Sequence, residues 1–459
     1  MTLLLMMACL EPADSGLTPP DDSTPVIDSP VDTQPQGCDA RGGVSGEVCV
    51  LEAPCSWVGD SRAYFGTAMA VGDLDADGAV ELVVGAPGHA GTVGTGAGAV
   101  FVLSGDGFPS REALISGPNT SDYFGSDVAI VPDAEGDRVL VGAMGVDDDA
   151  AIGVGAAVLL NGEGTELARW SGVDAYDRVG WTVHSGADHD GDGVADVWLT
   201  SDWRDQDDDP GTGSANLFLG GALNGGSIQD ADLTLTGSGR ANVGHAYVNG
   251  DFDGDGSTDL MVSAPYAEGY KGAVYQVSGG TSPEALPEPW AVGEASSDAF
   301  GFRLAAADFD GDGKDELVVG APLNDRVDNA AGAVFVYSGQ EVVSVWTGEW
   351  MDVQAGTGLG TADMDQDGQP ELLVGSVSAF RGLATHAGRV YVVDALAGGA
   401  LGDATTVVHG GGTKDYLGHP ILGADVDGDG ADDLLLGTAY VNQDGAYDVG
   451  SVYLFHGQP

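Results

Sequence analysis

One acidic segment recurs along the chain, and this repetition constrains the fold more strongly than any other feature. The first copy, residues 73–87, reads DLDADGAVELVVGAP. Further copies begin at Asp188, Asp251, Asp308, Asp363 and Asp425, and a degenerate copy begins at Asp133. The seven starts lie 55–63 residues apart. Such a period indicates one supersecondary unit repeated side by side, and not several unrelated domains.

Every unit has the same internal order of short segments. An apolar residue and a glycine open it, and a strand of small residues leads to the acidic loop. In the first unit an aliphatic strand at 81–84, a third strand at 99–103 and a fourth at 113–115 follow. The opening pairs are Phe65-Gly66, Phe124-Gly125, Val179-Gly180, Val243-Gly244, Phe300-Gly301, Leu359-Gly360 and Leu417-Gly418. Four short strands per unit predict an all-β, seven-bladed β-propeller of four-stranded antiparallel blades.

The two ends of the repeat array complement each other. The chain ends after the third strand of the seventh unit, residues 451–455, and lacks a fourth. Residues 54–59, before the first unit, resemble the fourth strand at 289–293. We therefore predict that this N-terminal strand closes the last blade, because ring closure removes exposed sheet edges.

The opening pair and the close of each unit resemble a known repeat. The pair Phe65-Gly66, the acidic loop and the close Gly85-Ala86-Pro87 resemble the FG-GAP repeats of integrin α-subunit propellers and their bacterial relatives, over about residues 52–459. The resemblance implies calcium in several blades and a role in adhesion and ligand binding. Three units depart from the usual close, at Thr200-Ser201-Asp202, Gly375-Ser376-Val377 and Gly437-Thr438-Ala439.

Six of the loops read Asp-x-Asp-x-Asp-Gly-x-x-Asp/Glu. Carboxylates at positions 1, 3, 5 and 9 and the carbonyl of position 7 supply six to seven hard oxygens, which suit Ca²⁺. We predict about six calcium sites, and their candidate ligands are Asp73, Asp75, Asp77, Ala79, Glu81, Asp188, Asp190, Asp192, Val194, Asp196, Asp251, Asp253, Asp255, Ser257, Asp259, Asp308, Asp310, Asp312, Lys314, Glu316, Asp363, Asp365, Asp367, Gln369, Glu371, Asp425, Asp427, Asp429, Ala431 and Asp433.

Two other interpretations fit these loops less well. An EF-hand needs Glu at position 12, where this chain has aliphatic residues such as Val84 and Leu199. A plain turn needs one Asp and one Gly, not four acids in nine residues. The degenerate loop at 132–138 lacks the spacing, and we expect no calcium there.

The charge balance excludes one class of partner. The chain has 72 Asp and Glu against 15 Lys and Arg, a net charge of −57. Nucleic acid needs a basic surface, so it is not expected as a partner. The loops account for only part of this acidity, and the remainder suggests a saline habitat or an acidic binding face.

The N-terminal region has a different composition. Residues 1–9 form a signal or lipoprotein-like segment that ends in Ala8-Cys9, although no Lys or Arg precedes its apolar run. We expect export, with lipid on Cys9 as the one membrane attachment; the alternative is a misassigned N-terminus without processing. Residues 10–51 are predicted to be a disordered tether rich in Pro, Asp, Ser and Thr. The sequence contains no run of 18 apolar residues, so no transmembrane helix is predicted.

The localisation expected from this region is the cell surface, as an outer-membrane lipoprotein, or the medium, as a secreted protein. Lipid on Cys9 would leave Cys38, Cys49 and Cys55, which allow one disulfide pair and either a free thiol or a bond to another chain. The sequence does not select the pair.

The function predicted from the sequence is ligand binding or adhesion. No Gly-x-Ser-x-Gly, His-Glu-x-x-His or Cys/His cluster is present, so no catalytic residue is assigned. The alternatives are a hydrolase or lyase on a propeller scaffold and a purely structural surface protein. A His or Lys converging with a carboxylate in the central channel would favour an enzyme.

The ligand, a protein or a polysaccharide, is expected on the face opposite the calcium loops. The connections predicted there are longer and more varied than the calcium loops. They carry acidic stretches at 147–149 and 205–209 and the aromatic residues Trp203, Tyr266, Tyr270, Phe380, Tyr440 and Tyr447.

Overall fold

The computed structural model describes residues 46–50, 53, 55–104, 110–148, 151–202, 211–279, 288–380, 386–442 and 446–457. The predictions for Cys9, for Cys38, for Trp203 and for the acidic stretch 205–209 lie outside these residues. Most of the tether predicted at 10–51 lies outside them too. Within the described part of the chain, no helix has the length and apolar character needed to cross a membrane.

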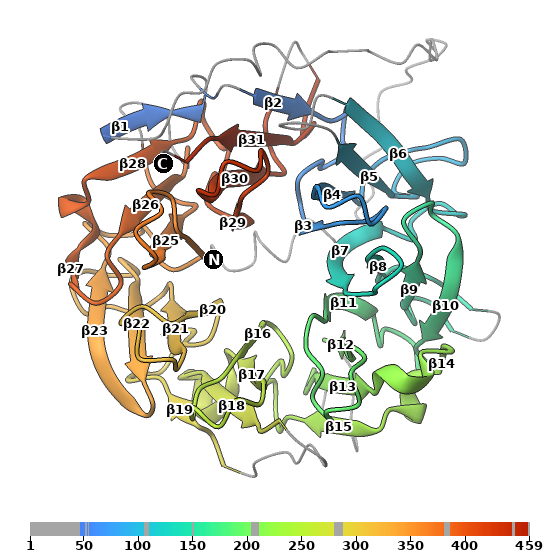
Figure 1. Ribbon diagram of the computed structural model, residues 1–459, viewed down its shortest axis with the longest axis horizontal. Coiled ribbons are helices and arrows are strands. Elements are labelled where there is room, and N and C mark those ends of the chain that lie inside the picture. Colours follow the sequence, from blue (N-terminus) through green and yellow to red (C-terminus); the bar gives the residue numbers. More distant parts are fainter. Residues whose placement is uncertain are drawn as a thin grey trace, which may run out of the picture. The chain divides into compact units, whose positions relative to one another are not determined.

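Seven small antiparallel sheets form a ring, which is a seven-bladed β-propeller, as predicted (Figure 1). Blade 1 holds β3 (Met69–Gly72), β4 (Glu81–Ala86), β5 (Ala99–Ser104) and β6 (Ser110–Ser116). Blade 2 holds β7 (Phe124–Val131), β8 (Arg138–Ala143), β9 (Ala156–Leu160) and β10 (Glu166–Ser171). Blade 3 holds β11 (Val179–His184), β12 (Val197–Ser201), β13 (Ser214–Phe218) and β15 (Leu233–Thr236). Blade 4 holds β16 (Tyr247–Gly250), β17 (Asp259–Ala264), β18 (Ala273–Val277) and β19 (Ala291–Val292).

The remaining three blades follow the same order. Blade 5 holds β20 (Leu304–Ala307), β21 (Glu316–Ala321), β22 (Ala333–Ser338) and β23 (Glu341–Thr347). Blade 6 holds β24 (Gly358–Ala362), β25 (Glu371–Ser376), β26 (Arg389–Val393) and β28 (Thr406–His409). Blade 7 holds β29 (Ile421–Ala424), β30 (Asp433–Thr438), β31 (Ser451–Phe455) and β2 (Cys55–Val58). The first strand of each blade lies nearest the ring's centre (Figure 1).

The core lies between neighbouring blades. In β4 all six residues are buried, because the second strand has a strand on each side and a blade against each face. The phenylalanine of the opening pair fills the space between blades: Phe65 is fully buried, and its ring centroid lies 5.5 Å from that of Phe101. The glycine that follows it, Gly66, has φ of +85°, and a Cβ there would lie 2.6 Å from the carbonyl oxygen of Ser451.

One opening pair was assigned wrongly from the sequence. In the sixth unit, the position that corresponds to Phe65 is Ala355, which bridges to Gly332 and precedes Gly356 at φ +88°. Leu359 and Gly360 lie inside β24 instead. The sequence pattern misled because blade 6 fills this position with the small side chain of Ala355, which is fully buried in the core shared by blades 5 and 6.

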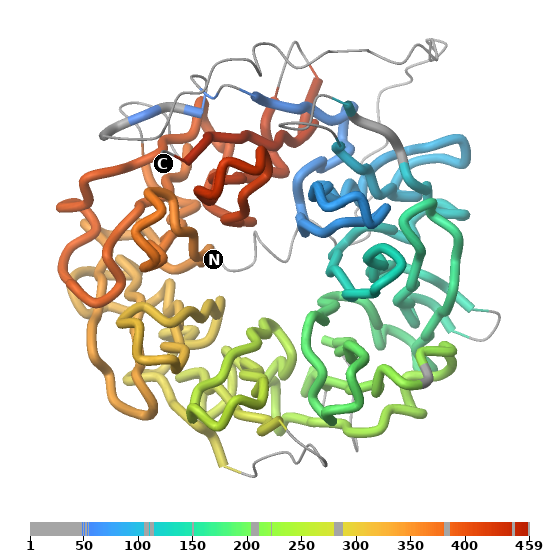
Figure 2. The backbone as a smooth tube through the Cα atoms, in the orientation of Figure 1, coloured from blue at the N-terminus to red at the C-terminus, as the bar shows by residue number. Residues whose placement is uncertain are grey.

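The predicted closure is confirmed. Strand β2 pairs antiparallel with β31, with Cys55 opposite Leu454 and Val58 opposite Ser451. Figure 2 shows these blue and red segments side by side. Trp57 and Val452 belong to the same core cluster as Phe65, so closure buries apolar surface and also pairs a sheet edge.

Among the residues that the structure describes, three blades carry a fifth, parallel strand that the sequence did not predict. Strand β14 (Gly226–Ser227) pairs with β10, and β27 (Gly399–Ala400) pairs with β23. Strand β1 (Gly46–Cys49) pairs with β28, so the part of the predicted tether at 46–49 is ordered strand. Val48 packs on the blade 6–7 core and Val50 is buried in it, because the outer edge of blade 6 would otherwise be uncovered.

Candidate functional site

The six acidic loops join the first strand of a blade to its second, and they fold through their own aspartates. In blade 3 the carboxylate of Asp188 accepts hydrogen bonds from the backbone N–H groups of Gly191 (2.7 Å), Asp192 (3.0 Å) and Gly193 (2.7 Å). Equivalent bonds to the position-1 aspartate occur in the other five loops. Because these bonds are local, the Asp-x-Asp-x-Asp-Gly pattern itself specifies the loop conformation.

The folded loops bring their carboxylates together. Oxygens of positions 1, 3 and 9 lie within 4.8 Å of one another in at least three of the described loops: Asp73, Asp75 and Glu81; Asp188, Asp190 and Asp196; and Asp308, Asp310 and Glu316. In blade 4 the group is Asp251, Asp253 and Asp255. Burial, together with the neighbouring charges of Asp190 and Asp188, raises the pKa of Asp196 to about 6. Clustered carboxylates of this kind repel one another, and a bound cation would offset that repulsion.

The position-9 carboxylate shows whether a hard cation fits. In blade 5 one oxygen of Glu316 accepts from the backbone N–H of Phe309 (3.0 Å). The other oxygen, Oε1, is buried and accepts no hydrogen bond of normal geometry among the described residues. Burial raises the pKa of Glu316, and the nearby side chain of Ser338 opposes that rise. A buried carboxylate oxygen beside two further aspartates offers a ligand to a metal ion. The residues of this loop therefore fit the predicted calcium ion.

Position 9 of blade 4 differs from this arrangement. Both oxygens of Asp259 already accept hydrogen bonds, from the Gly279 backbone N–H (2.9 Å) and from the Gln276 side chain (2.9 Å). Burial raises the pKa of Asp259, and the nearby charges of Asp253 and Asp255 also raise it. The sequence pattern alone treats Asp259 as equivalent to Glu316, and the structure does not.

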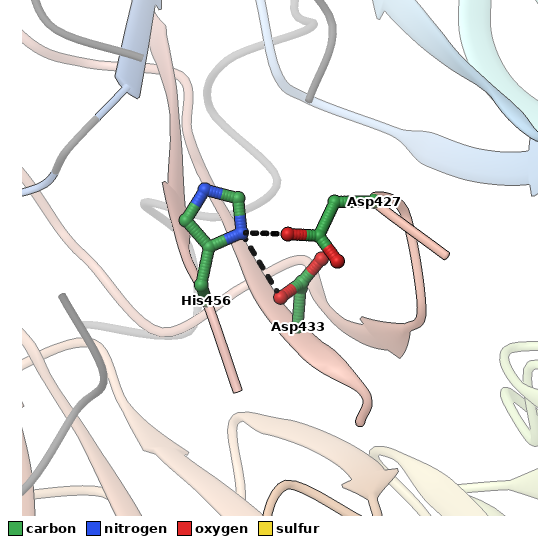
Figure 3. A group of neighbouring side chains, drawn as sticks. All are labelled: Asp427, Asp433 and His456. Carbon is green, nitrogen blue, oxygen red and sulfur yellow. Dashed lines mark hydrogen bonds and ion pairs between the residues drawn. The ribbon is translucent and has the colours of Figure 1, made fainter. Parts of the chain in front are cut away.

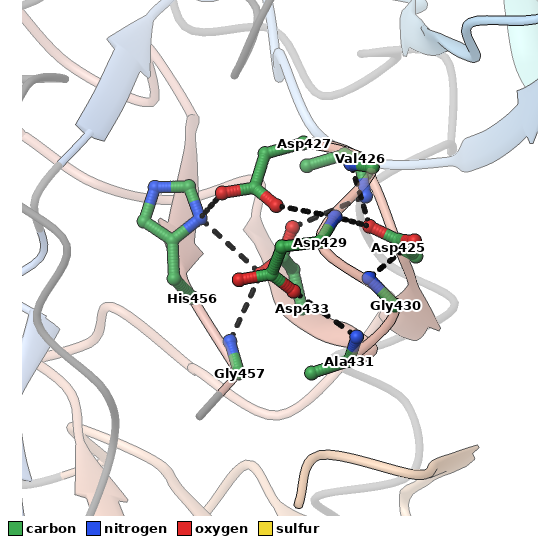
Figure 4. Close-up of polar contacts among 10 residues, drawn as sticks. Asp425, Val426, Asp427, Asp429, Gly430, Ala431, Asp433, His456 and Gly457 are labelled. Carbon is green, nitrogen blue, oxygen red and sulfur yellow. Dashed lines mark hydrogen bonds and ion pairs between the residues drawn. The ribbon is translucent and has the colours of Figure 1, made fainter. Parts of the chain in front are cut away.

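Blade 7 has a histidine that the sequence analysis missed (Figure 3). His456 follows β31, and its Nδ1 lies 3.2 Å from Asp433 Oδ1 and 3.5 Å from Asp427 Oδ2. The three side chains are only 5%, 1% and 4% exposed. Figure 4 shows Asp433 also accepting from the Gly457 backbone N–H, at 2.9 Å. The equivalent positions in blades 3, 4 and 5 carry Leu219, Ser278 and Ser338, so the imidazole sets this site apart.

The degenerate loop of blade 2 carries its own cation. The guanidinium of Arg138 forms an ion pair with Asp133, the residue that corresponds to position 1. The second aspartate, Asp137, accepts a hydrogen bond from the backbone N–H of Asp73 in blade 1 (3.1 Å). An internal cation beside Asp133 agrees with the prediction that this loop holds no calcium, which stays a prediction.

Acids at position 8 link neighbouring loops, a role that the sequence analysis did not assign. Asp315 of blade 5 accepts from the backbone N–H of Asp251 in blade 4 (2.8 Å), and Asp432 of blade 7 accepts from that of Asp363 in blade 6 (2.9 Å). Each link fixes the first residue of one loop to the next blade. The loops therefore also set the spacing of blades.

Aromatic side chains gather on the face opposite the acidic loops. Ring centroids follow one another at 5.8 Å (Tyr64 to Tyr440), 5.4 Å (Tyr440 to Tyr416), 5.6 Å (Tyr416 to His386) and 5.8 Å (His386 to Phe380). We call these five half-buried residues the aromatic row; it spans blades 1, 7 and 6. Of these five residues, only Tyr440 and Phe380 were predicted from the sequence. The other predicted tyrosines lie outside the row, and Tyr270 (54%) and Tyr447 (66%) are largely exposed.

The test for a catalytic centre is met in part. The imidazoles of His245 and His419 converge on the guanidinium of Arg303, among residues that precede the innermost strands. The charge of Asp127 acts on the same guanidinium. No described carboxylate lies within ion-pair distance of Arg303 or of these two imidazoles, so no acid and base pair is assembled here.

The fold and its loops define the class of protein: a β-propeller built from one acidic-loop repeat. The family model described as "FG-GAP repeat" matches residues 65–103, 243–275 and 300–337, which fall in blades 1, 4 and 5. Three of the seven blades thus carry a recognised FG-GAP repeat, and the ring as a whole is similar to an integrin α-like FG-GAP propeller.

Similar proteins include integrin subunits and an enzyme. The chain is 31% identical to integrin alpha-7 of Rattus norvegicus over 195 residues, which are 39% of this chain and 16% of that protein. It is 28% identical to integrin alpha-5 of Xenopus laevis over 232 residues, 47% of this chain and 21% of that protein. It is 30% identical to phosphatidylinositol-glycan-specific phospholipase D of Rattus norvegicus over 174 residues, 35% of this chain and 20% of that protein. The chain thus spans about a fifth or less of these relatives.

Proposed function

We propose that this chain is an exported propeller that holds calcium in its acidic loops and binds a protein or polysaccharide ligand on the opposite face, as an adhesion module. The observation that carries the proposal is the aromatic row, from Tyr64 to Phe380. Tyrosines combine a large apolar contact with a hydroxyl that can hydrogen-bond, and they are frequent anchors of binding surfaces.

Calcium has a structural role in this proposal. Bound by carboxylates such as Asp308, Asp310 and Glu316, it would supply the positive charge that the crowded loop lacks. Since Asp315 and Asp432 tie loops to neighbouring blades, an ordered loop also holds two blades in register. The aromatic row draws its rings from three blades, so its geometry depends on that register. Calcium would thus support ligand binding without touching the ligand.

Export is supported by the chemistry of the N-terminal strand. Cys55 forms a disulfide bond, which persists in oxidising compartments outside the cytosol. Its partner's side chain lies outside the described residues. The integrin alpha subunits among the relatives favour an adhesion role, and the phospholipase D match keeps a propeller-scaffold enzyme as the alternative.

Binding to a panel of immobilised extracellular proteins and polysaccharides, measured in calcium and in chelator, tests the proposal. We expect at least one ligand to bind in calcium, and Tyr440→Ala and Tyr416→Ala each to weaken that binding about tenfold with the melting temperature unchanged. Tyr270 is exposed but lies outside the aromatic row. Tyr270→Ala is therefore the matched control and should bind the ligand as the unaltered protein does. Binding that is indifferent to the row substitutions would overturn the proposal.

A further inference from the structure

Arg303 lies where side chains from three blades meet. It precedes β20 of blade 5, while His245 precedes β16 of blade 4 and His419 precedes β29 of blade 7. Its Nη1 lies 3.2 Å from His245 Nε2, and its Nη2 lies 2.7 Å from His419 Nε2. All three side chains are half-buried. They stand at the strand ends opposite the acidic loops, and therefore on the same face as the aromatic row.

The guanidinium of Arg303 has more N–H donors than there are hydrogen-bond acceptors among the described residues around it. Arginine carries five N–H donors. Nη1 donates to the Phe302 carbonyl (2.9 Å), and Nε and Nη2 both face the ring of His419, at 3.4 Å and 2.7 Å. A neutral imidazole has a single acceptor nitrogen, so His419 and His245 accept one bond each. At least two donors of Arg303 thus have no acceptor among the described residues.

Both imidazoles remain neutral beside this cation. Burial, together with the charge of Arg303, lowers the pKa of His245 to about 3. Burial and Arg303 also lower the pKa of His419 well below its usual value. Since Nε2 of His245 accepts from Arg303, its Nδ1 carries the proton and requires an acceptor. The amide nitrogen of Asn242 stands 3.4 Å from this Nδ1, while the buried Oδ1 of Asn242 has no hydrogen-bond partner among the described residues. Exchanging the amide oxygen and nitrogen of Asn242 places Oδ1 beside Nδ1 as the required acceptor.

Arg303 is also unusual in its charge environment. Arg326 pairs with Glu294 and Arg389 pairs with Glu349, as expected in a chain of net charge −57. Arg303 has no described carboxylate within ion-pair distance, and Asp127 acts on it only over a longer range. A half-buried guanidinium with spare donors and no carboxylate contact is prepared to receive an anion from outside.

We propose that Arg303, flanked by His245 and His419, binds a carboxylate group of the ligand. The planar fork of the guanidinium matches the two oxygens of a carboxylate. A monoanion fits better than a phosphate dianion, because a single guanidinium faces it and the surrounding protein is strongly acidic. This inference names the chemistry of the ligand under the proposed function and rests on it for its biological meaning.

Titration with acetate tests the site without any knowledge of the natural ligand. In the unaltered protein we expect saturable shifts of the His245 and His419 imidazole resonances, assigned with His245→Gln and His419→Gln. Arg303→Gln should weaken acetate binding at least about tenfold, as expected for loss of a charge-assisted hydrogen bond. Arg326→Gln, which removes a surface guanidinium, should leave the acetate titration unchanged.

Three outcomes would overturn the inference. The first is the absence of a saturable shift in the unaltered protein, which means that water alone satisfies Arg303. The second is tighter binding of inorganic phosphate than of acetate, and the third is acetate binding by Arg303→Gln that equals that of the unaltered protein. If Arg303→Gln does not fold, the imidazole shifts of the unaltered protein still decide. Failure here with success of the aromatic-row experiment would leave the adhesion function standing and remove only the carboxylate. If acetate binds as expected but the aromatic-row experiment fails, the carboxylate site stands and the adhesion function is removed.

Discussion

Trp57 in β2 lies directly opposite Val452 in β31, although the two residues stand near opposite ends of the repeat array. Removing β2 would leave β31 with an unpaired edge and expose the core around Phe65. We expect deletion of residues 1–37 to leave a monomeric propeller with an unchanged melting temperature. Deletion of residues 1–60 should lower the melting temperature and cause association, seen by size-exclusion chromatography.

The longer deletion also removes the Cys55 disulfide, so a separate control is needed. Cys55→Ser in the full chain keeps β2 and breaks only that bond. Equal melting temperatures for the two deletion variants would contradict closure of the ring by strand pairing. So would a fall in melting temperature for Cys55→Ser that equals the fall caused by the longer deletion.

Chelation of calcium should destabilise the propeller. A site with ligand at about 100 times its dissociation constant contributes about 2.7 kcal/mol, against a typical net stability of about 5–15 kcal/mol. The melting temperature should fall in chelator and recover with calcium but not with magnesium. Glu316→Gln should remove one bound calcium, counted by elemental analysis, whereas Asp328→Asn, an exposed acid outside the loops, should remove none. An unchanged melting curve in metal-free protein would contradict a structural role for calcium.

The pH dependence of stability should reverse when calcium is removed. The pKa of Asp196 is raised to about 6 in the folded chain, above the value near 3.8 expected when unfolded, so the folded state binds the proton more tightly. Without calcium, the free energy of unfolding should therefore rise as pH falls from about 6 towards about 4. With calcium bound, protons compete with the metal and the same change should lower stability. Denaturant melts between pH 4.5 and 7.5, with and without chelator, measure both slopes.

A matched variant tests whether Asp196 contributes to this slope. Asp196→Asn cannot titrate, so its metal-free stability should vary less with pH than that of the unaltered protein. Asp328→Asn should retain the full slope. Identical pH profiles for all three proteins would rule out Asp196 as a source of the slope.

His456 should give the blade 7 loop a metal preference of its own. Imidazole nitrogen is a good ligand for Co²⁺ and Zn²⁺ and a poor one for Ca²⁺. We expect one Co²⁺ to bind with an absorption spectrum that indicates nitrogen coordination, and His456→Ser, which installs the residue found in blades 4 and 5, to abolish that spectrum. His89→Ser, far from the acidic loops, should preserve it. A cobalt spectrum unaffected by His456→Ser would show that the imidazole serves only as a hydrogen-bonding partner of Asp427 and Asp433.

Most of the fold was predictable because its determinants are local. The strand and turn pattern of each unit repeats within about 60 residues, and hairpins between neighbouring strands form from segments close in sequence. The acidic loops fold through hydrogen bonds between residues two to five positions apart, as around Asp188. The closing strand was predictable because one blade lacked a strand and the N-terminal segment resembled it.

Other features depend on contacts between residues far apart in the chain. The pairing of β1 with β28 and the aromatic row from Tyr64 to Phe380 each join segments that no local pattern connects. The convergence of His245, Arg303 and His419 is of the same kind. His456 and Asp433, by contrast, lie 23 positions apart in one blade, and the pairing of β31 with β30 brings them together. The sequence by itself determined the blades, their number and the conformation of the acidic loops, because these rest on local hydrogen bonds and repeated patterning. Only the tertiary structure decided which side chains meet across blades, because ring closure brings distant segments together at the centre and on the face opposite the loops.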